Sequence, residues 1–281
     1  MSVERITVGI DDSTGAHAAL RWVAHRARTT PMRVELVHAI EWYEAESYWA
    51  ATRARIEKLG ELITAENADV SVSVTLRAGS PKQILLDTSE RSDLLVIGAH
   101  RSRIIRSALA GSLPEAIATL AAVPTVVVAD DADIRDGDIV VGTAAGEPNS
   151  PVVFGAREAA RSGGTVSLVS AWQLPIPMGA HPVTLAERPE LFRESAELEL
   201  TGATAVLRAE APDVAVRELL AEGSPVGALV DAATHAAMIV VGRKHRTTIG
   251  GAVFGSTARD LFHRTRTPVC VVPPTWQPTA E

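Results

Sequence analysis

Residues 94–112 read LLVIGAHRSRIIRSALAGS, and residues 238–256 read MIVVGRKHRTTIGGAVFGS. Each stretch begins with a strand-length run of apolar residues ending in glycine, and then passes through a basic loop to a second glycine followed by serine. Residue 238 lies 144 positions after residue 94, and the glycines and serines keep this spacing. The same sequence of strand, loop and helix start therefore occurs twice in the chain.

The repeat extends along almost the whole chain. A Gly-Ser-Pro turn and the proline before the last strand recur at the spacing of 144 positions, and the first strand recurs at a spacing of 133. We predict a tandem duplication in which copy one spans residues 1–130 and copy two spans residues 137–275. The acidic stretch at residues 130–137 is typical of an exposed linker. The matched positions are Gly79 and Gly223, Pro81 and Pro225, Pro124 and Pro268, and Val8-Gly9 and Val141-Gly142.

Strand-like and helix-like patterns alternate within each copy. In copy one, Val, Ile and Leu concentrate at residues 6–10, 34–39, 70–76, 94–98 and 125–128, and helical patterns fill the intervals. Continuous apolar runs are typical of parallel strands covered by helices on both faces, whereas residues 70–76 alternate with Ser and Thr like a half-exposed edge strand. Copy two repeats the order. The predicted fold class is α/β, with two tandem doubly wound parallel-sheet domains of five strands each.

The composition excludes several classes of protein. The chain has 281 residues, of which 46% are hydrophobic and 22% charged, as in soluble chains that fold around a core. Its formal net charge of -7 gives no strong basic field, so we expect neither nucleic acid nor a membrane surface as a partner. The single cysteine, Cys270, lies in a valine-rich run and is expected to pack there. We expect a cytoplasmic protein, because the N-terminus lacks the order of a signal peptide.

The loops after the first and fourth strands are the places where an open parallel sheet binds ligands. A glycine at a strand end, such as Gly98, lets a ligand approach the backbone, and Gly111-Ser112 at a helix start offers amides, a hydroxyl and the positive end of the helix dipole. This combination suits a phosphate group. The other interpretation is that Ser112 and Glu115 form a capping box and serve only the helix. Copy two has Arg259 where copy one has Glu115.

These residues together resemble the universal stress protein family in its tandem, two-domain form. The resemblance rests on VGIDDS at residues 8–13, the Gly-Ser-Pro turn, the glycine loop after the fourth strand and the duplication itself. It implies a Rossmann-like fold similar to the adenine-nucleotide alpha hydrolases. It also implies ATP binding by a pattern of Gly, two residues, Gly, nine residues, Gly and Ser or Thr, with an aspartate beside the nucleoside. The matching residues are Asp11, Gly98, Gly111 and Ser112 in copy one, and Gly242, Gly255 and Ser256 in copy two.

The chain departs from the family pattern at three positions. The second glycine is Arg101 in copy one and His245 in copy two, and Ala144 stands where copy one has Asp11. A side chain at the glycine position either blocks the phosphates or, in the case of Arg101, binds them as a cation. We therefore expect ATP, with or without Mg²⁺, in copy one. The alternative is that both sites are degenerate.

Two functional hypotheses follow from the sequence. The first is a stress-response regulatory module that binds an adenine nucleotide without rapid turnover, because no Walker A lysine motif, GxGxxG fingerprint or GxSxG elbow is present and no catalytic or metal-ligating residue can be assigned. The second is an interaction or scaffold protein. In either case, the apolar last strands at residues 124–128 and 268–272 are expected to pair edge to edge. This pairing would join the copies into an internal pseudo-dimer or join two chains into a homodimer.

Overall fold

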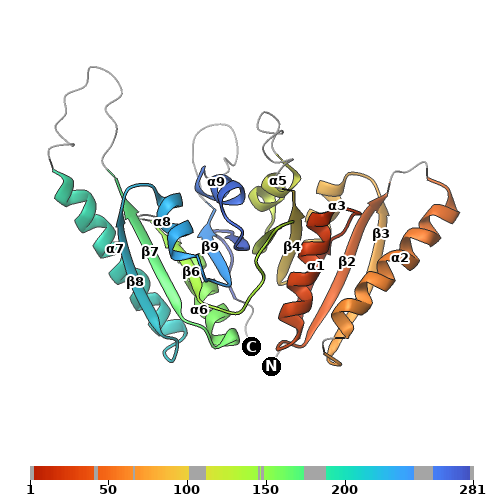
Figure 1. The fold of residues 1–281 in the computed structure, drawn as a ribbon, viewed down its shortest axis with the longest axis horizontal. Coiled ribbons are helices and arrows are strands. Elements are labelled where there is room, and N and C mark those ends of the chain that lie inside the picture. The colour runs from red at the N-terminus through yellow and green to blue at the C-terminus, as the bar shows by residue number, and fades with distance from the viewer. Residues whose placement is uncertain are drawn as a thin grey trace, which may run out of the picture.

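The computed structural model describes residues 3–40, 44–65, 67–100, 112–144, 146, 149–173, 188–243 and 256–278. Its centre is one ten-stranded sheet with the order β3-β2-β1-β4-β5-β10-β9-β6-β7-β8. The first five strands in this order belong to copy one and the last five to copy two, so the copies lie side by side along the sheet (Figure 1). The expectation of two tandem doubly wound α/β units is confirmed.

Each copy follows the alternation that the sequence predicts. Copy one contains β1 (Glu4–Gly9), α1 (Thr14–Ala27), β2 (Met32–Ile40), α2 (Glu46–Thr64), β3 (Val70–Ala78), α3 (Pro81–Ser89), β4 (Leu94–Ala99), α5 (Leu113–Leu120) and β5 (Thr125–Ala129). Copy two contains β6 (Ile139–Thr143), α6 (Ser150–Ser162), β7 (Val166–Trp172), α7 (Pro189–Glu210), β8 (Val216–Glu222), α8 (Pro225–Ala232), β9 (Met238–Gly242), α9 (Ser256–Arg264) and β10 (Val269–Val272).

Local sequence explains where these elements lie and end. The central strand β4 is buried along nearly its whole length, while β3 alternates buried, intermediate and exposed residues and lies at the edge of the sheet, as predicted. Proline occupies the first turn of α3, α5, α6, α7 and α8, where the missing N–H costs no helix hydrogen bond. Helix α6 ends at Gly163, which adopts the left-handed conformation with φ 71°.

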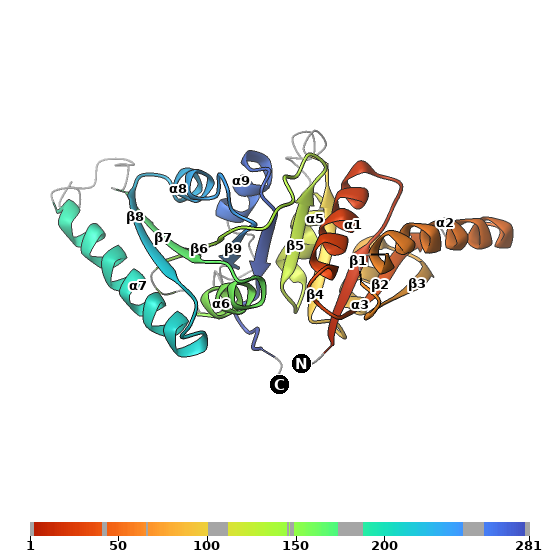
Figure 2. The same cartoon turned by 60° about the horizontal axis from the view of Figure 1, so that its bottom comes forward.

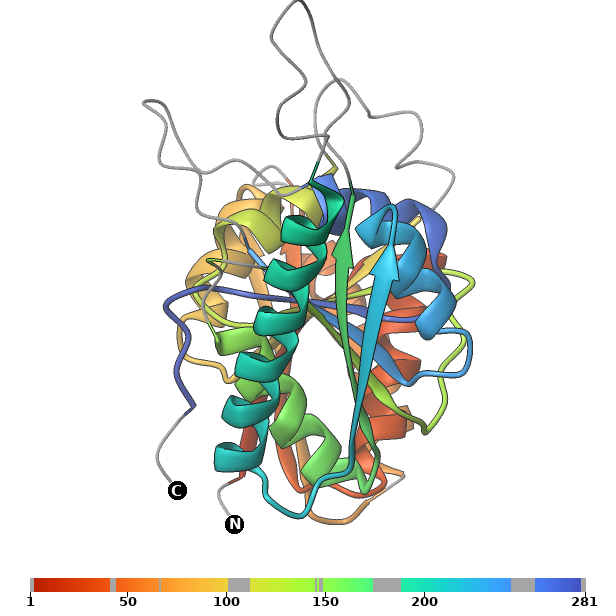
Figure 3. The same cartoon turned by 90° about the vertical axis from the view of Figure 1, so that its left-hand side faces the viewer.

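Helices cover both faces of the sheet and form two separate cores. One core packs α1, α2, α6 and α7 against one face, and the other packs α3, α5, α8 and α9 against the opposite face. Figure 2 shows α8 and α9 on one side of the copy-two strands and α6 and α7 on the other, and Figure 3 shows α7 beside β7 and β8 at the outer edge of copy two. Both cores contain residues of both copies. Among the helices of the described ranges, none is long and apolar enough to cross a membrane.

The two copies meet where β5 pairs with β10. These strands are antiparallel, and Val126 lies opposite Cys270 in the register. We call this contact the seam, together with the helices that flank it, α1 and α6 on one face and α5 and α9 on the other. Cys270 is fully buried here, and burial raises the pKa of its thiol well above the ordinary value. Its environment is that of a packing residue, as the sequence suggested.

Candidate functional site

Each copy has a hollow at the carboxyl ends of its first and fourth strands. The copy-one hollow has a volume of about 600 Å³ and the copy-two hollow about 580 Å³. They are lined by largely the same repeat positions, since Gly9, Val37, Pro81, Leu85 and Gly98 in one correspond to Gly142, Val169, Pro225, Leu229 and Gly242 in the other. The strand order reverses at these points, which is where doubly wound sheets bind ligands.

Asp11 lies at the mouth of the copy-one hollow, in the turn between β1 and α1. Its side chain is exposed, and its Oδ1 accepts a hydrogen bond of 3.0 Å from the Ser13 amide. Ser13 in turn caps α1, because its hydroxyl accepts a bond of 3.0 Å from the Ala16 amide. The neighbouring Asp12 forms an ion pair with Arg55 of α2 and does not line the hollow. The two adjacent acids therefore have different surroundings.

His38 of β2 also lines the copy-one hollow. Its Nδ1 lies 2.6 Å from the carbonyl oxygen of Ile10, which can only accept a hydrogen bond, so the ring proton lies on Nδ1. In the neutral ring, Nε2 is then an acceptor. His38 is not among the site residues predicted from the sequence. The available indication was a polar side chain in the otherwise apolar second half of β2, and copy two has Ser170 at the corresponding position.

Gly98 lines the hollow, but its lack of a side chain serves the packing of α1. A Cβ atom placed there would lie 2.0 Å from the carbonyl carbon of Gly15 and 2.5 Å from the amide nitrogen of Ala16. No real contact is that short, so only glycine allows the start of α1 to approach β4. Gly98 thus has a packing role, and its predicted role as clearance for a ligand stays a prediction.

The start of α5 forms the other end of the copy-one hollow. Ser112 is the N-cap, and its hydroxyl accepts a bond of 3.4 Å from the Glu115 amide, which confirms half of the predicted capping box. The other half is wrong, because the Glu115 carboxylate lies 3.3 Å from Nε of Arg259 in α9. Pro114 contributes no amide to this first turn. Leu113, whose side chain is exposed, lines the hollow.

A small polar cluster holds the chain at the point where the glycine loop leaves β4. Nδ1 of His100 lies 3.0 Å from the Asp130 carboxylate and 3.2 Å from the Thr14 hydroxyl. These contacts join the ends of β4 and β5 to the first residue of α1. The loop residues predicted to contact phosphate, Arg101 and Gly111, lie outside the described residues, as do His245 and Gly255 of copy two.

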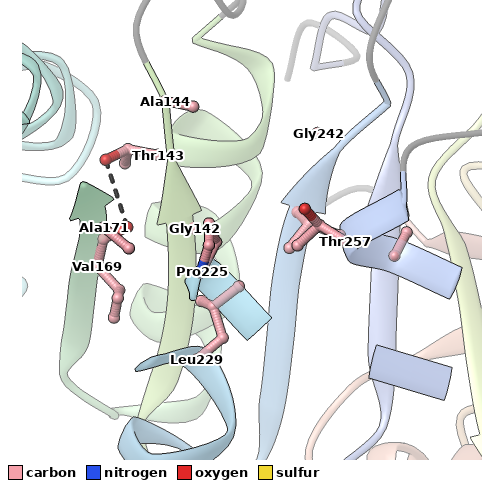
Figure 4. Close-up of a pocket in the computed structure, with 11 residues that line it drawn as sticks. Gly142, Thr143, Ala144, Val169, Ala171, Pro225, Leu229, Gly242 and Thr257 are labelled. Atoms are coloured by element: carbon pink, nitrogen blue, oxygen red, sulfur yellow. Dashed lines mark hydrogen bonds between the residues drawn. The ribbon is translucent and has the colours of Figure 1, made fainter. Parts of the chain in front are cut away.

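The copy-two hollow has no carboxylate among the described residues that line it (Figure 4). Ala144 stands in the place of Asp11, and the Thr143 hydroxyl donates a bond of 3.4 Å to the carbonyl of Val169. Thr257 of α9 lines the hollow at the position that Leu113 has in copy one, and Ser256 is the first, exposed residue of that helix. Within the described ranges of the whole chain, no group of three or more His, Cys, Asp or Glu is arranged to hold a metal ion.

A doubly wound sheet that occurs twice, with a hollow at each reversal of strand order, defines a duplicated α/β protein. The model of the universal stress protein family matches residues 2–129 and 137–273. The chain belongs to the universal stress protein family.

Relatives of the same length support this assignment. The chain is 26% identical over 293 residues to a universal stress protein of Mycobacterium tuberculosis, covering 95% of this chain and 96% of that protein. It is 28% identical over 294 residues to one of Mycolicibacterium smegmatis, covering 96% and 97%. Among solved structures, a universal stress protein from Archaeoglobus fulgidus has a TM-score of 0.66 at 15% identity, with 96% of each chain covered. This last similarity supports the fold.

Proposed function

We propose that this protein is a cytoplasmic stress-response module that binds ATP in the copy-one hollow and regulates other molecules without catalysing a reaction. The observation that carries the proposal is that Asp11 and Leu113, the first residue of the capped helix α5, line the same hollow. The resemblance to nucleotide-binding members of the family supports the same ligand.

The lining of the copy-one hollow suits the chemistry of an adenine nucleotide. Apolar side chains of Val37, Ile84 and Leu85 offer a surface for a base, and the Asp11 carboxylate can accept hydrogen bonds from ribose hydroxyls. The start of α5 favours phosphate through its dipole. Mg²⁺ would enter as the partner of the triphosphate, since hard oxygen ligands of this kind suit it.

The copy-two hollow has the apolar walls without the acid. We propose that it binds nucleotide more weakly than the copy-one hollow, because Ala144 cannot accept a hydrogen bond from a ribose hydroxyl. We also propose that the seam persists in solution, so that the two copies form an intramolecular pseudo-dimer. A scaffold role with neither hollow occupied remains the competing function, and the experiment below distinguishes the two.

Calorimetric titration with ATP tests the proposal on the full chain. The wild type should bind ATP, and Asp11→Ala should weaken binding roughly tenfold or more, since hydrogen bonds to a charged group contribute about 1.5–3 kcal/mol. Asp12→Ala is the matched control, because this adjacent acid pairs with Arg55 outside the hollow. Equal affinity of Asp11→Ala and the wild type would overturn the proposed site. No binding by the wild type at millimolar ATP would favour the scaffold role.

A further inference from the structure

The seam brings the same repeat position of the two copies face to face. Val126 and Cys270 are 144 positions apart, which is the spacing of the duplication here, and they lie opposite each other in the antiparallel pair of β5 and β10. The duplication also relates the two neighbouring pairs, Val127 with Val269 and Thr125 with Val271, because Val127 corresponds to Val271 and Thr125 to Val269. The seam therefore has an internal two-fold axis, at which a position meets its own counterpart.

On one face of the sheet, the counterparts at the seam are an arginine and a glutamate. Arg26 of α1 and Glu158 of α6 are 132 positions apart, the spacing that also relates Val37 to Val169. Two bonds of 2.6 and 2.8 Å join the guanidinium to both carboxylate oxygens, and the side chains are only 3% and 6% exposed. Burial alone would raise the pKa of Glu158, but Arg26 and Arg161 lower it to about 2.

Charged residues beside the Arg26–Glu158 pair have signs that stabilise this arrangement, with arginine in copy one and glutamate in copy two. Glu4 of copy one binds Arg26 through bonds of 2.7 and 2.8 Å, and Arg161 of copy two binds Glu158 at 3.0 Å. Arg161 also donates a bond of 3.1 Å across the seam to the hydroxyl of Thr30. Each member of the pair thus has a further partner of opposite charge within its own copy.

On the opposite face, the counterparts again have opposite charges, in the reverse order. Glu115 of α5 and Arg259 of α9 are 144 positions apart, and their carboxylate and Nε lie 3.3 Å apart. The Glu115 side chain is 8% exposed and Arg259 is 49% exposed. His263 of α9 lies 3.9 Å from the same carboxylate. At two separate positions of the seam, the copies therefore carry opposite charges, and the two counterparts at each position pair with each other.

Pairing of like copies would bring like charges together at both positions. Copy one against a second copy one would place two Arg26 guanidinium groups together on one face and two Glu115 carboxylates together on the other. Copy two against copy two would do the same with Glu158 and Arg259. Unpaired or like charges in a buried contact are strongly unfavourable, and such clashes are what makes an interface selective.

We propose that these two charge pairs make the seam selective for pairing of copy one with copy two. Each copy therefore pairs with the other copy of its own chain, and a like copy of a second chain is rejected. This selectivity does not depend on nucleotide binding. Duplication within one chain is what permits it, because a symmetric homodimer has the same residue on both sides of its axis.

The Glu115–Arg259 pair allows a charge-exchange test in the full chain, because the Arg259 side chain is half exposed. Glu115→Arg and Arg259→Glu should each lower the melting temperature by roughly 3–8 °C, and the double exchange should recover more than half of the larger loss. Glu115→Gln, which removes the charge without reversing it, should have a smaller effect than Glu115→Arg. Losses that simply add in the double variant would overturn the proposal.

A mixing experiment tests selectivity between chains directly. The variant Glu158→Arg with Arg259→Glu gives copy two the charges of copy one, and the variant Arg26→Glu with Glu115→Arg gives copy one the charges of copy two. Alone, each should have an open seam and stay at the mass of one chain, 29.7 kDa. Mixed, the unaltered copy one of the first variant and the unaltered copy two of the second can rebuild the native seam.

Native mass spectrometry with one variant isotopically labelled distinguishes the outcomes. The proposal expects a complex of one chain of each variant and no complex of either variant with itself. Homodimers of either variant, or a seam in each variant as compact and stable as that of the wild type, would overturn it. If these variants do not fold, the exchange at Glu115 and Arg259 decides the question alone.

Discussion

The two hollows have the same architecture and different chemistry. Glycine, valine, proline and leucine recur at matched positions of their walls. The difference lies in the turn after the first strand, where copy one has Asp11 and copy two has Ala144. Duplication has thus preserved the cavity while one copy lacks the acid that the other has.

The phosphate ends of the hollows differ in the opposite sense. Pro114 occupies the first turn of α5, and the Glu115 amide donates to the Ser112 hydroxyl, so few amides of this turn are free for a ligand. Helix α9 has Ala258 at the position of Pro114 and keeps that amide. On the proposed function, copy one therefore offers more to the sugar of a nucleotide and copy two more to its phosphates. Their relative affinity measures which of these groups matters more.

The largest expected effect is on protein stability, through the close packing of α1 against β4 beside the copy-one hollow. Gly98→Ala should destabilise the protein by at least about 3 kcal/mol, because the added Cβ would meet the backbone of Gly15 and displace α1. Urea denaturation measures this loss. Gly202→Ala in α7 is the control, since nothing lies within 4 Å of its added Cβ, and it should stabilise by roughly 0.5–1 kcal/mol. Equal stability of the two variants would show that the close approach of α1 is not required.

Acid should destabilise the seam that joins the two copies and their hollows. The pKa of Glu158 is lowered from its ordinary 4.5 to about 2 in the folded state. Its ionised form therefore stabilises the folded state at pH values above about 4.5. This stabilisation should disappear as the pH falls from about 4.5 toward 2. Urea midpoints measured across this range should fall less steeply for Glu158→Gln than for the wild type. Glu197→Gln, in an exposed ion pair of α7, should keep the wild-type slope.

Restoring the acid in copy two should reduce the difference between the hollows. We expect Ala144→Asp to strengthen nucleotide binding in copy two roughly tenfold, because the surrounding walls match those around Asp11. Titration of Asp11→Ala with Ala144→Asp isolates the new site from the original one. Failure of this double variant to bind more ATP than Asp11→Ala would mean that the glycine loops, and not the acid, set the difference.

The smallest expected effect concerns the helix cap of copy one. Ser112→Ala should cost about 0.5–1 kcal/mol of stability in the absence of nucleotide, because the Glu115 amide loses its acceptor. Thermal denaturation without and with ATP separates this capping role from ligand binding. A loss of stability equal in both conditions assigns Ser112 to the helix alone, whereas a larger loss with ATP assigns it to the ligand as well.

The sequence predicted the fold well because the fold rests on local patterns and on repetition. Strand-length valine runs, the alternation at residues 70–76 and proline at helix starts each act within a few residues. Contacts between distant residues could not be predicted in this way. Glu115 looked like part of its own helix cap, and only the placement of α9 beside α5 shows that it binds Arg259. The packing of α1 against Gly98 likewise depends on Gly15, which lies 83 residues earlier in the chain.

The most direct measurement is the number of ATP molecules bound per chain, counted by native mass spectrometry on the wild type at an ATP concentration that saturates the tighter site. One nucleotide per chain is expected, lost in Asp11→Ala and retained in Asp12→Ala. Two nucleotides of equal affinity would contradict the difference between the hollows. None would contradict nucleotide binding itself and leave the scaffold role in its place.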